Sequence, residues 1–163
     1  MNVLGVDTSS ASSGHALLED GEMREYAVWR PSATEKKIGG MVRMWSYYTW
    51  FNTWVGLRKG VIDMVAIEEL GVMRGAKTAR VLGQFETIAI IVCMRNNLMV
   101  VRVKAGVARN LVLGMNPNSP KEQVLEEVRR QFPHVKFPPK NQGGEDVADA
   151  FVAAKAGPMA VGR

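Results

Sequence analysis

The sequence predicts one α/β domain in which helices cover a β-sheet. Two observations favour this class: short, continuously apolar segments that are typical of buried strands, and longer segments whose apolar residues recur at helical spacing. Three strands come first, and helices alternate with the two remaining strands after them, with no internal repeat and no linker. A length of 163 residues suits one domain with a substantial core, so we expect a single unit over residues 1–163.

The predicted strands are short apolar segments that end at turn residues or charges. The first three follow one another closely, and Glu19-Asp20-Gly21 is typical of a hairpin turn between the second and the third. The fourth is apolar throughout, as a central parallel strand should be. The five predicted strands cover residues 2–7, 15–18, 23–29, 61–68 and 98–103.

The first helical segment follows Pro31, with Ser32 or Thr34 as its cap, and continues to about residue 57. Its apolar residues recur at helical spacing and predict a face that packs in the core. These residues are Met41, Met44, Trp45, Tyr48 and Val55.

Four more helices are expected after the fourth strand, over residues 76–95, 104–113, 119–132 and 145–156. The third of these has a strong start signal. Ser119 is the expected N-cap, Pro120 the first helical residue, and Glu122 the partner that completes a capping box.

Composition and charge narrow the possible functions. No apolar stretch is long enough to span a bilayer, and the single cysteine, Cys93, excludes an internal disulfide framework, so we expect a cytoplasmic protein. Residues 71–143 carry 12 basic and 4 acidic groups, whereas residues 1–70 carry 7 basic and 9 acidic groups. A basic middle segment is typical of proteins that bind polyanions, and equally of a solvated basic surface.

Four carboxylates stand where folding would gather them. Asp7 ends the first strand and Glu68 ends the fourth, while Asp146 and Asp149 are three residues apart and share one face of the last helix. Carboxylates at the ends of buried strands are costly unless a cation neutralises them. Each residue alone is more often a turn or helix-start residue, but their joint occurrence predicts a divalent-metal site of a nuclease.

The chemistry of phosphodiester hydrolysis fits such a site. The reaction needs an activated water, stabilisation of the charge on phosphorus and help for the departing oxygen, which two hard cations about 4 Å apart can provide. Mg²⁺ prefers oxygen ligands, so Asp and Glu side chains suffice, and Mn²⁺ is an expected substitute. The only histidines, His15 and His134, have no partner pattern, and a zinc site is not expected.

An ordered set of motifs along nearly the whole chain resembles the RuvC-type Holliday-junction resolvases of the RNase H-like superfamily. The chain also resembles the short, divergent resolvases of this family that bacteriophages encode. A phage-encoded protein of this kind would be expected in the host cytoplasm. The motifs are Leu4-Gly5-Val6-Asp7, Ala66-Ile67-Glu68-Glu69, Gly83-Gln84, residues 107–114, Lys121-Glu122-Gln123-Val124 and Asp146-Val147-Ala148-Asp149-Ala150.

This resemblance implies an RNase H-like fold with a mixed five-stranded central sheet flanked by helices. It also implies a metal-dependent endonuclease that nicks four-way DNA junctions as a homodimer. The resemblance implies that the family's catalytic metal ligands correspond by position to Asp7, Glu68, Asp146 and Asp149. Strand alternation agrees with this choice, because Glu69 should point to the opposite face from Glu68.

The same family has an aromatic residue shortly after the strand-end glutamate, where it can stack on an opened junction base. Here the segment is Leu70-Gly71-Val72-Met73, so stacking is not expected there, and basic residues that follow it can hold phosphates instead. Arg109 and Lys121 fall where the family keeps basic residues that support DNA binding and cleavage. The predicted DNA-binding residues are Arg74, Lys77, Arg80, Lys104, Arg109 and Lys121.

Three other interpretations stay open on the sequence alone. The N-terminal motif is also similar to actin-like ATPases and to scaffold proteins of tRNA threonylcarbamoyladenosine synthesis, although Glu68 and the Asp146/Asp149 pair are not expected of these. A non-catalytic nucleic-acid-binding module is a second possibility, but four uncompensated acids would repel phosphate. The third is a nuclease of the same fold with broader substrates, such as flaps, forks or structured RNA.

Overall fold

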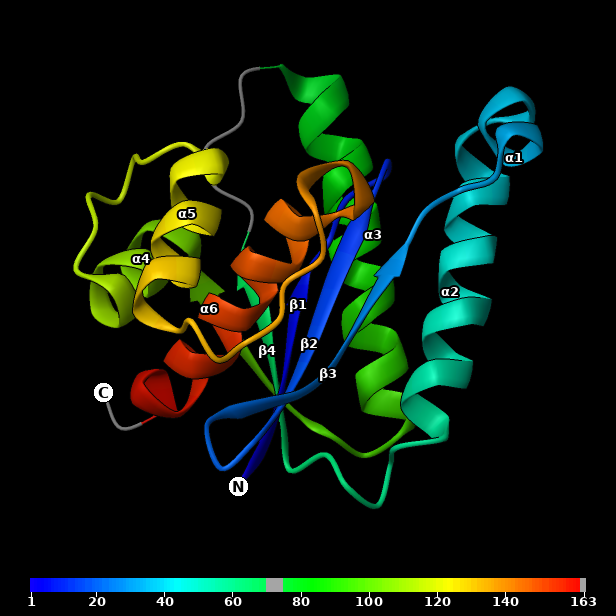
Figure 1. The fold of residues 1–163 in the computed structure, drawn as a ribbon. Helices are drawn as coiled ribbons and strands as arrows, with labels where there is room; N and C mark the ends of the chain where they lie inside the picture. Colours follow the sequence, from blue (N-terminus) through cyan, green and yellow to red (C-terminus); the bar gives the residue numbers. More distant parts are fainter. Residues whose placement is uncertain (70–74, 162–163) are drawn as a thin grey trace.

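The structure, a computed structural model, describes residues 1–69 and 75–161. Its centre is a mixed five-stranded sheet in the order β3-β2-β1-β4-β5, with helices on both faces (Figure 1). β1 pairs antiparallel with β2 and β2 with β3, whereas β1–β4 and β4–β5 are parallel. The strands are β1 (Asn2–Asp7), β2 (Ser13–Glu19), β3 (Glu22–Trp29), β4 (Met64–Glu69) and β5 (Met99–Lys104). The predicted fold class is confirmed.

Helices connect and flank these strands. They are α1 (Ala33–Ile38), α2 (Gly40–Gly56), α3 (Ala76–Arg95), α4 (Ala105–Leu113), α5 (Lys121–Gln131) and α6 (Gly144–Val161), with a short 3₁₀ turn, η1 (Lys140–Gln142), before α6. Figure 1 shows α2 and α3 on one side of the sheet and α4, α5 and α6 on the other. Over the described ranges, none of these helices has both the length and the apolar character that crossing a membrane requires.

Side-chain alternation along the strands divides the core into two parts. In β4, Met64 and Ala66 pack with α6, whereas Val65 and Ile67 face the core beneath α2 and α3. The predicted alternation in this strand is therefore confirmed. Because both faces are covered, β1 and β4 are apolar on both sides until their final carboxylates.

α6 lies unusually close to the sheet because small residues face it. A Cβ built on Gly5 of β1 would lie 1.8 Å from the carbonyl oxygen of Ala150, and one on Gly14 of β2 would lie 2.2 Å from the Asp146 carbonyl. Both clashes are with backbone, which cannot move aside as a flexible side chain can. Glycine at these two positions therefore lets the helix that carries the aspartates rest directly on β1 and β2.

The first helical segment differs from its prediction in two ways. Ser32 does cap it, in a capping box with Glu35, but the segment breaks at Gly39, whose φ of 125° is not helical. The stripe along α2 is also only partly core. Val55 is fully buried, whereas Met41 and Trp45 are 79% and 69% exposed, because the buried face of α2 is the one that carries Tyr47 and Phe51.

Three predicted boundaries also need correction. β4 begins at Met64 rather than at residue 61. Pro120 is the N-cap of α5, with no side-chain capping bond, so the predicted Ser119 capping box is wrong; the Ser119 carbonyl accepts a hydrogen bond from Arg109 instead. α6 continues past residue 156 to Val161 despite containing Pro158, because Gly157 still packs against Ala66 of β4.

Candidate active site

The candidate site lies where β1 and β4 end side by side. These strands are parallel neighbours with Val6 opposite Ile67, so Asp7 and Glu68 reach the same edge of the sheet one residue later. α6 crosses this edge at its N-terminal end and supplies Asp146 and Asp149 from its first two turns. The predicted adjacency of the two strand-end carboxylates is confirmed.

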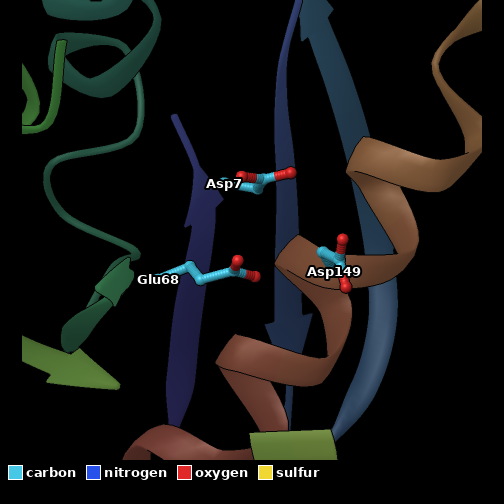
Figure 2. A group of neighbouring side chains, drawn as sticks. All are labelled: Asp7, Glu68 and Asp149. Carbon is cyan, nitrogen blue, oxygen red and sulfur yellow. The ribbon is translucent and has the colours of Figure 1, made fainter. Parts of the chain in front are cut away.

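Three of the four predicted carboxylates converge. Asp7, Glu68 and Asp149 each offer one oxygen, and these oxygens all lie within 4.8 Å of one another. In Figure 2 the side chains of Asp7 and Glu68 extend from the strand ends toward the helix that carries Asp149. Asp7 and Asp149 are buried, at 6% and 1% exposure. Asp146 lies outside this close group but is linked to it through Lys121.

Two basic side chains reach into the carboxylates. Lys121, the first residue of α5, places Nζ 2.5 Å from Asp7 Oδ2, 3.3 Å from Asp146 Oδ1 and 3.2 Å from Asp149 Oδ2. Arg109 of α4 donates to Asp149 Oδ1 at 2.9 Å and to the carbonyl of Ser119. Both side chains, which the sequence predicts to bind DNA, are therefore paired with the carboxylates in this structure.

Burial and mutual repulsion make the carboxylates hard to ionise together. The pKa of Asp7 is raised to about 7, chiefly by burial and also by the neighbouring Asp149 and Asp146, while Lys121 opposes them. The pKa of Glu68 is also raised well above its usual range, first by burial and then by Asp7 and Asp149. A cation in this space would relieve both effects.

The donor set fits a hard divalent cation. The ligands are carboxylate oxygens only, which suits Mg²⁺ or Mn²⁺ better than zinc. One buried oxygen, Asp149 Oδ2, also has no hydrogen-bond partner among the residues that the structure describes: Lys121 Nζ lies near it without favourable bond geometry. A buried carboxylate oxygen with no hydrogen bond is costly unless a cation or water completes its contacts.

Comparison with known proteins gives a consistent picture. The chain is 27% identical over 94% of its length, and 90% of the relative's, to a crossover junction endodeoxyribonuclease RuvC of Caldicellulosiruptor saccharolyticus. It is 26% identical over 99% of its length, and 98% of the relative's, to the RuvC of Carboxydothermus hydrogenoformans. Protein-family profiles give no match.

Solved structures extend the likeness to three dimensions. A Thermus thermophilus RuvC structure superposes with a TM-score of 0.73, at 17% identity, covering 98% of this chain and 96% of that one. The fold is that of RuvC. The same T. thermophilus protein in complex with a Holliday junction substrate also matches, with a TM-score of 0.73, 18% identity, and coverage of 95% of this chain and 91% of that one. The resemblance indicated by the sequence motifs is confirmed.

Within this RuvC fold, Glu69 is turned away from the carboxylate group. It lies 3.7 Å from Arg102 of β5, which also pairs with the buried Glu86 of α3 at 2.7 Å. Sequence reasoning did not identify this Glu69–Arg102–Glu86 network. It ties the end of β4 to β5 and α3.

The remaining predicted DNA-binding residues fall into two groups. Lys77 and Arg80 lie exposed near the start of α3, and Lys104 is exposed at the end of β5, all at the edge of the sheet that holds the carboxylates. Arg74 and the segment 70–73 lie outside the described residues. Nothing in the spacing of Arg109 and Lys121 from the aspartates revealed their contacts, since 40 and 25 residues separate these pairs.

Proposed function

We propose that this protein is a metal-dependent endonuclease that nicks four-way DNA junctions by phosphodiester hydrolysis. The supporting observation is the convergence of Asp7, Glu68 and Asp149 at the edge of a RuvC fold, in a chain whose curated relatives bear the name crossover junction endodeoxyribonuclease. The proposed catalytic set is Asp7, Glu68, Asp146 and Asp149. A divalent cation bound there, Mg²⁺ or Mn²⁺, would activate a water and stabilise negative charge on the phosphate. The proposed substrate places the enzyme in the cytoplasm.

The decisive experiment is cleavage of a labelled synthetic four-way junction beside a matched duplex, flap and fork, with Mg²⁺ and with chelator. We expect nicking of the junction with metal only. Equal cleavage of flap and fork would replace junction selectivity with a broader branched-DNA activity. Absence of cleavage of every substrate, with junction binding retained, would instead favour a non-catalytic binding module.

Two matched variants identify the catalytic glutamate. Glu68→Gln should lower the cleavage rate at least about a hundredfold, because losing a metal ligand removes several kcal/mol of transition-state stabilisation. Glu69→Gln makes the same chemical change one residue later, where the side chain faces Arg102, and should leave most activity. The reverse pattern would show that the wrong glutamate has been chosen.

We further propose that the active form is a homodimer, since symmetric nicking of a junction requires two sites. A groove of about 300 Å³ between α2 and α3 is the surface at which we expect the second protomer to bind. Its lining is almost wholly apolar and consists of Met41, Met44, Trp45, Tyr48, Ile88 and Ile91. An exposed apolar surface of this kind on both protomers is self-complementary about a two-fold axis.

A further inference from the structure

The carboxylate group has two sides that differ in charge. On one side the ammonium group of Lys121 contacts Asp7, Asp146 and Asp149 at 2.5–3.3 Å. On the other side is Glu68, whose carboxylate has neither a hydrogen-bond nor an ion-pair partner among residues 1–69 and 75–161. The Asp7–Asp149 side is thus filled by a cation of the protein itself, whereas no cationic side chain among the described residues pairs with Glu68.

Charge balance gives this asymmetry a consequence. When all four carboxylates are ionised, Lys121 and Arg109 compensate two of the four negative charges, and one divalent cation compensates the rest. Accommodating another divalent cation on the Asp7–Asp149 side would bring two positive charges within about 4 Å of the ammonium, a strong repulsion away from bulk water. Lys121 must therefore leave before that side is free.

The two basic residues are not equally able to move. Arg109 is held by Asp149 and by the Ser119 carbonyl, and its side chain is only 11% exposed. Lys121 is held by the carboxylates alone, its side chain is 41% exposed, and its flexible stem starts at the N-terminal residue of α5. Among the described residues, Lys121 has no hydrogen bond or ion pair other than those with the carboxylates, so it can swing toward solvent once they release it.

Building on the proposed function, we propose that Lys121 is a resident counter-ion that occupies the Asp7–Asp149 side until substrate draws it out. A DNA phosphate at the site offers the ammonium group an equivalent anionic partner. Lys121 then couples the two binding events: DNA makes the Asp7–Asp149 side available to a divalent cation, and by linkage the cation strengthens DNA binding to the same extent. In the DNA-free protein, Lys121 thus prevents a divalent cation from binding on the Asp7–Asp149 side.

The test uses DNA-free protein and Mn²⁺ alone, with free Mn²⁺ followed by electron paramagnetic resonance. Lys121→Gln should bind Mn²⁺ at least about tenfold more tightly than the wild type, or take up an additional ion, while Lys121→Arg keeps the charge and the weaker binding. Lys140→Gln is the matched control: it removes the same charge near the start of α6, where Lys140 pairs with Glu122 and Glu145 outside the carboxylate group. Unchanged or weaker Mn²⁺ binding by Lys121→Gln would overturn the proposal.

A second measurement follows Lys121 itself. The Lys121 ammonium group, held by three carboxylates, should give a protected ¹H–¹⁵N signal in metal-free protein. This signal should be lost when junction DNA and Mg²⁺ are added to a Glu68→Gln background, in which cleavage is slowed and all three Lys121 partners are kept. A signal that persists with both ligands bound would contradict displacement. Because the Mn²⁺ titration contains no DNA, a protein that fails to cleave junctions leaves that result interpretable on its own.

Discussion

The two faces of the sheet are built from side chains of very different size. On the face covered by α6, the closest contacts are made by small residues, namely Gly5, Gly14 and Ala66, and there the helix backbone nearly touches the strands. On the face covered by α2 and α3, Trp29, Tyr47 and other aromatic rings fill a thicker layer, with ring centroids 5.0 Å apart for this pair. One face brings backbones together, and the other separates them with large side chains.

This difference in side-chain size explains why the carboxylates meet on the α6 side of the sheet. Short aspartate side chains on α6 can meet Asp7 only if the helix lies very close to β1, which the small residues permit. The aromatic face has no such requirement, and it leaves apolar side chains such as Trp45 exposed in the groove between α2 and α3. The face of small residues therefore brings the proposed catalytic carboxylates together, and the aromatic face carries the groove proposed for the second copy.

The largest expected effect comes from adding one methyl group to the face of small residues. Gly5→Ala would place Cβ 1.8 Å from the carbonyl oxygen of Ala150, so we expect a loss of about 3 kcal/mol or more in the free energy of unfolding, or failure to fold. Gly83→Ala in α3 meets nothing within 4 Å and should be neutral or stabilise by up to about 1 kcal/mol. Urea denaturation of both variants measures the contrast, and a Gly5→Ala protein as stable as the wild type would contradict the close packing.

The aromatic face should be sensitive to acid through a buried histidine. His15 is fully buried against Trp50 and Phe51, with ring centroids 4.9 and 5.0 Å away, and burial lowers its pKa to about 3. Its ordinary pKa of 6.5 applies when the chain unfolds, so its contribution to stability is complete above that pH and is lost as the pH falls toward 3. At about pH 4.5 the loss should be about 3 kcal/mol.

His15→Phe isolates this effect, since it keeps an aromatic ring and removes the titration. The stability difference between the two proteins, measured by urea denaturation in chelator, should shift in favour of the variant between about pH 7.5 and pH 4.5. The raised pKa of Asp7 acts in the opposite sense, stabilising the fold on acidification, but equally in both proteins, so it cancels. A pH-independent difference would mean that His15 is not shielded from water.

Much of this architecture was predictable because local patterns determine it. Continuous apolar strands, the alternation in β4 and the spacing of Asp146 and Asp149 each depend on neighbouring residues, and α3 has the predicted bounds of 76 and 95. The convergence of Asp7, Glu68 and Asp149 followed from the order of the elements, since parallel strands end at one edge.

What could not be predicted depends on tertiary contacts. The partners of Lys121 and Arg109 come from other elements, and an isolated basic residue near a helix start looks the same whether it faces solvent or a carboxylate. Ser119 was misassigned for a similar reason, because its carbonyl serves Arg109 while the helix starts one residue later than expected. The exposure of Met41 and Trp45 was missed because helical spacing groups residues on a face but does not show which face of a largely apolar helix meets the core.

A smaller effect is expected at the surface of the aromatic face. Ile91→Glu places a charge in the groove between α2 and α3, where Ile91 is 44% exposed, and should convert a dimer to monomers without loss of the fold. Met159→Glu, at a residue 49% exposed near the end of α6, is the control and should leave the mass unchanged. Light scattering at matched concentrations distinguishes them. If the wild type is monomeric at every concentration measured, the groove is not a dimer interface.

The smallest expected effect separates basic residues that lie free at the sheet edge from those engaged with the carboxylates. Arg80→Ala removes an exposed guanidinium and should flatten the slope of log affinity for junction DNA against log salt by about 0.9, the value for one phosphate contact. Arg109→Ala should change that slope little, because the Arg109 guanidinium is 11% exposed and already bonded to Asp149 and the Ser119 carbonyl. Removing the Arg109 guanidinium should instead lower the cleavage rate, since Asp149 would be left without its positioning partner.

Titrations of both variants over a range of salt concentrations, in chelator to prevent nicking, provide the measurement. If Arg109→Ala flattens the slope as much as Arg80→Ala, then Arg109 leaves Asp149 to hold a phosphate when DNA binds, and the division between the two groups of basic residues fails.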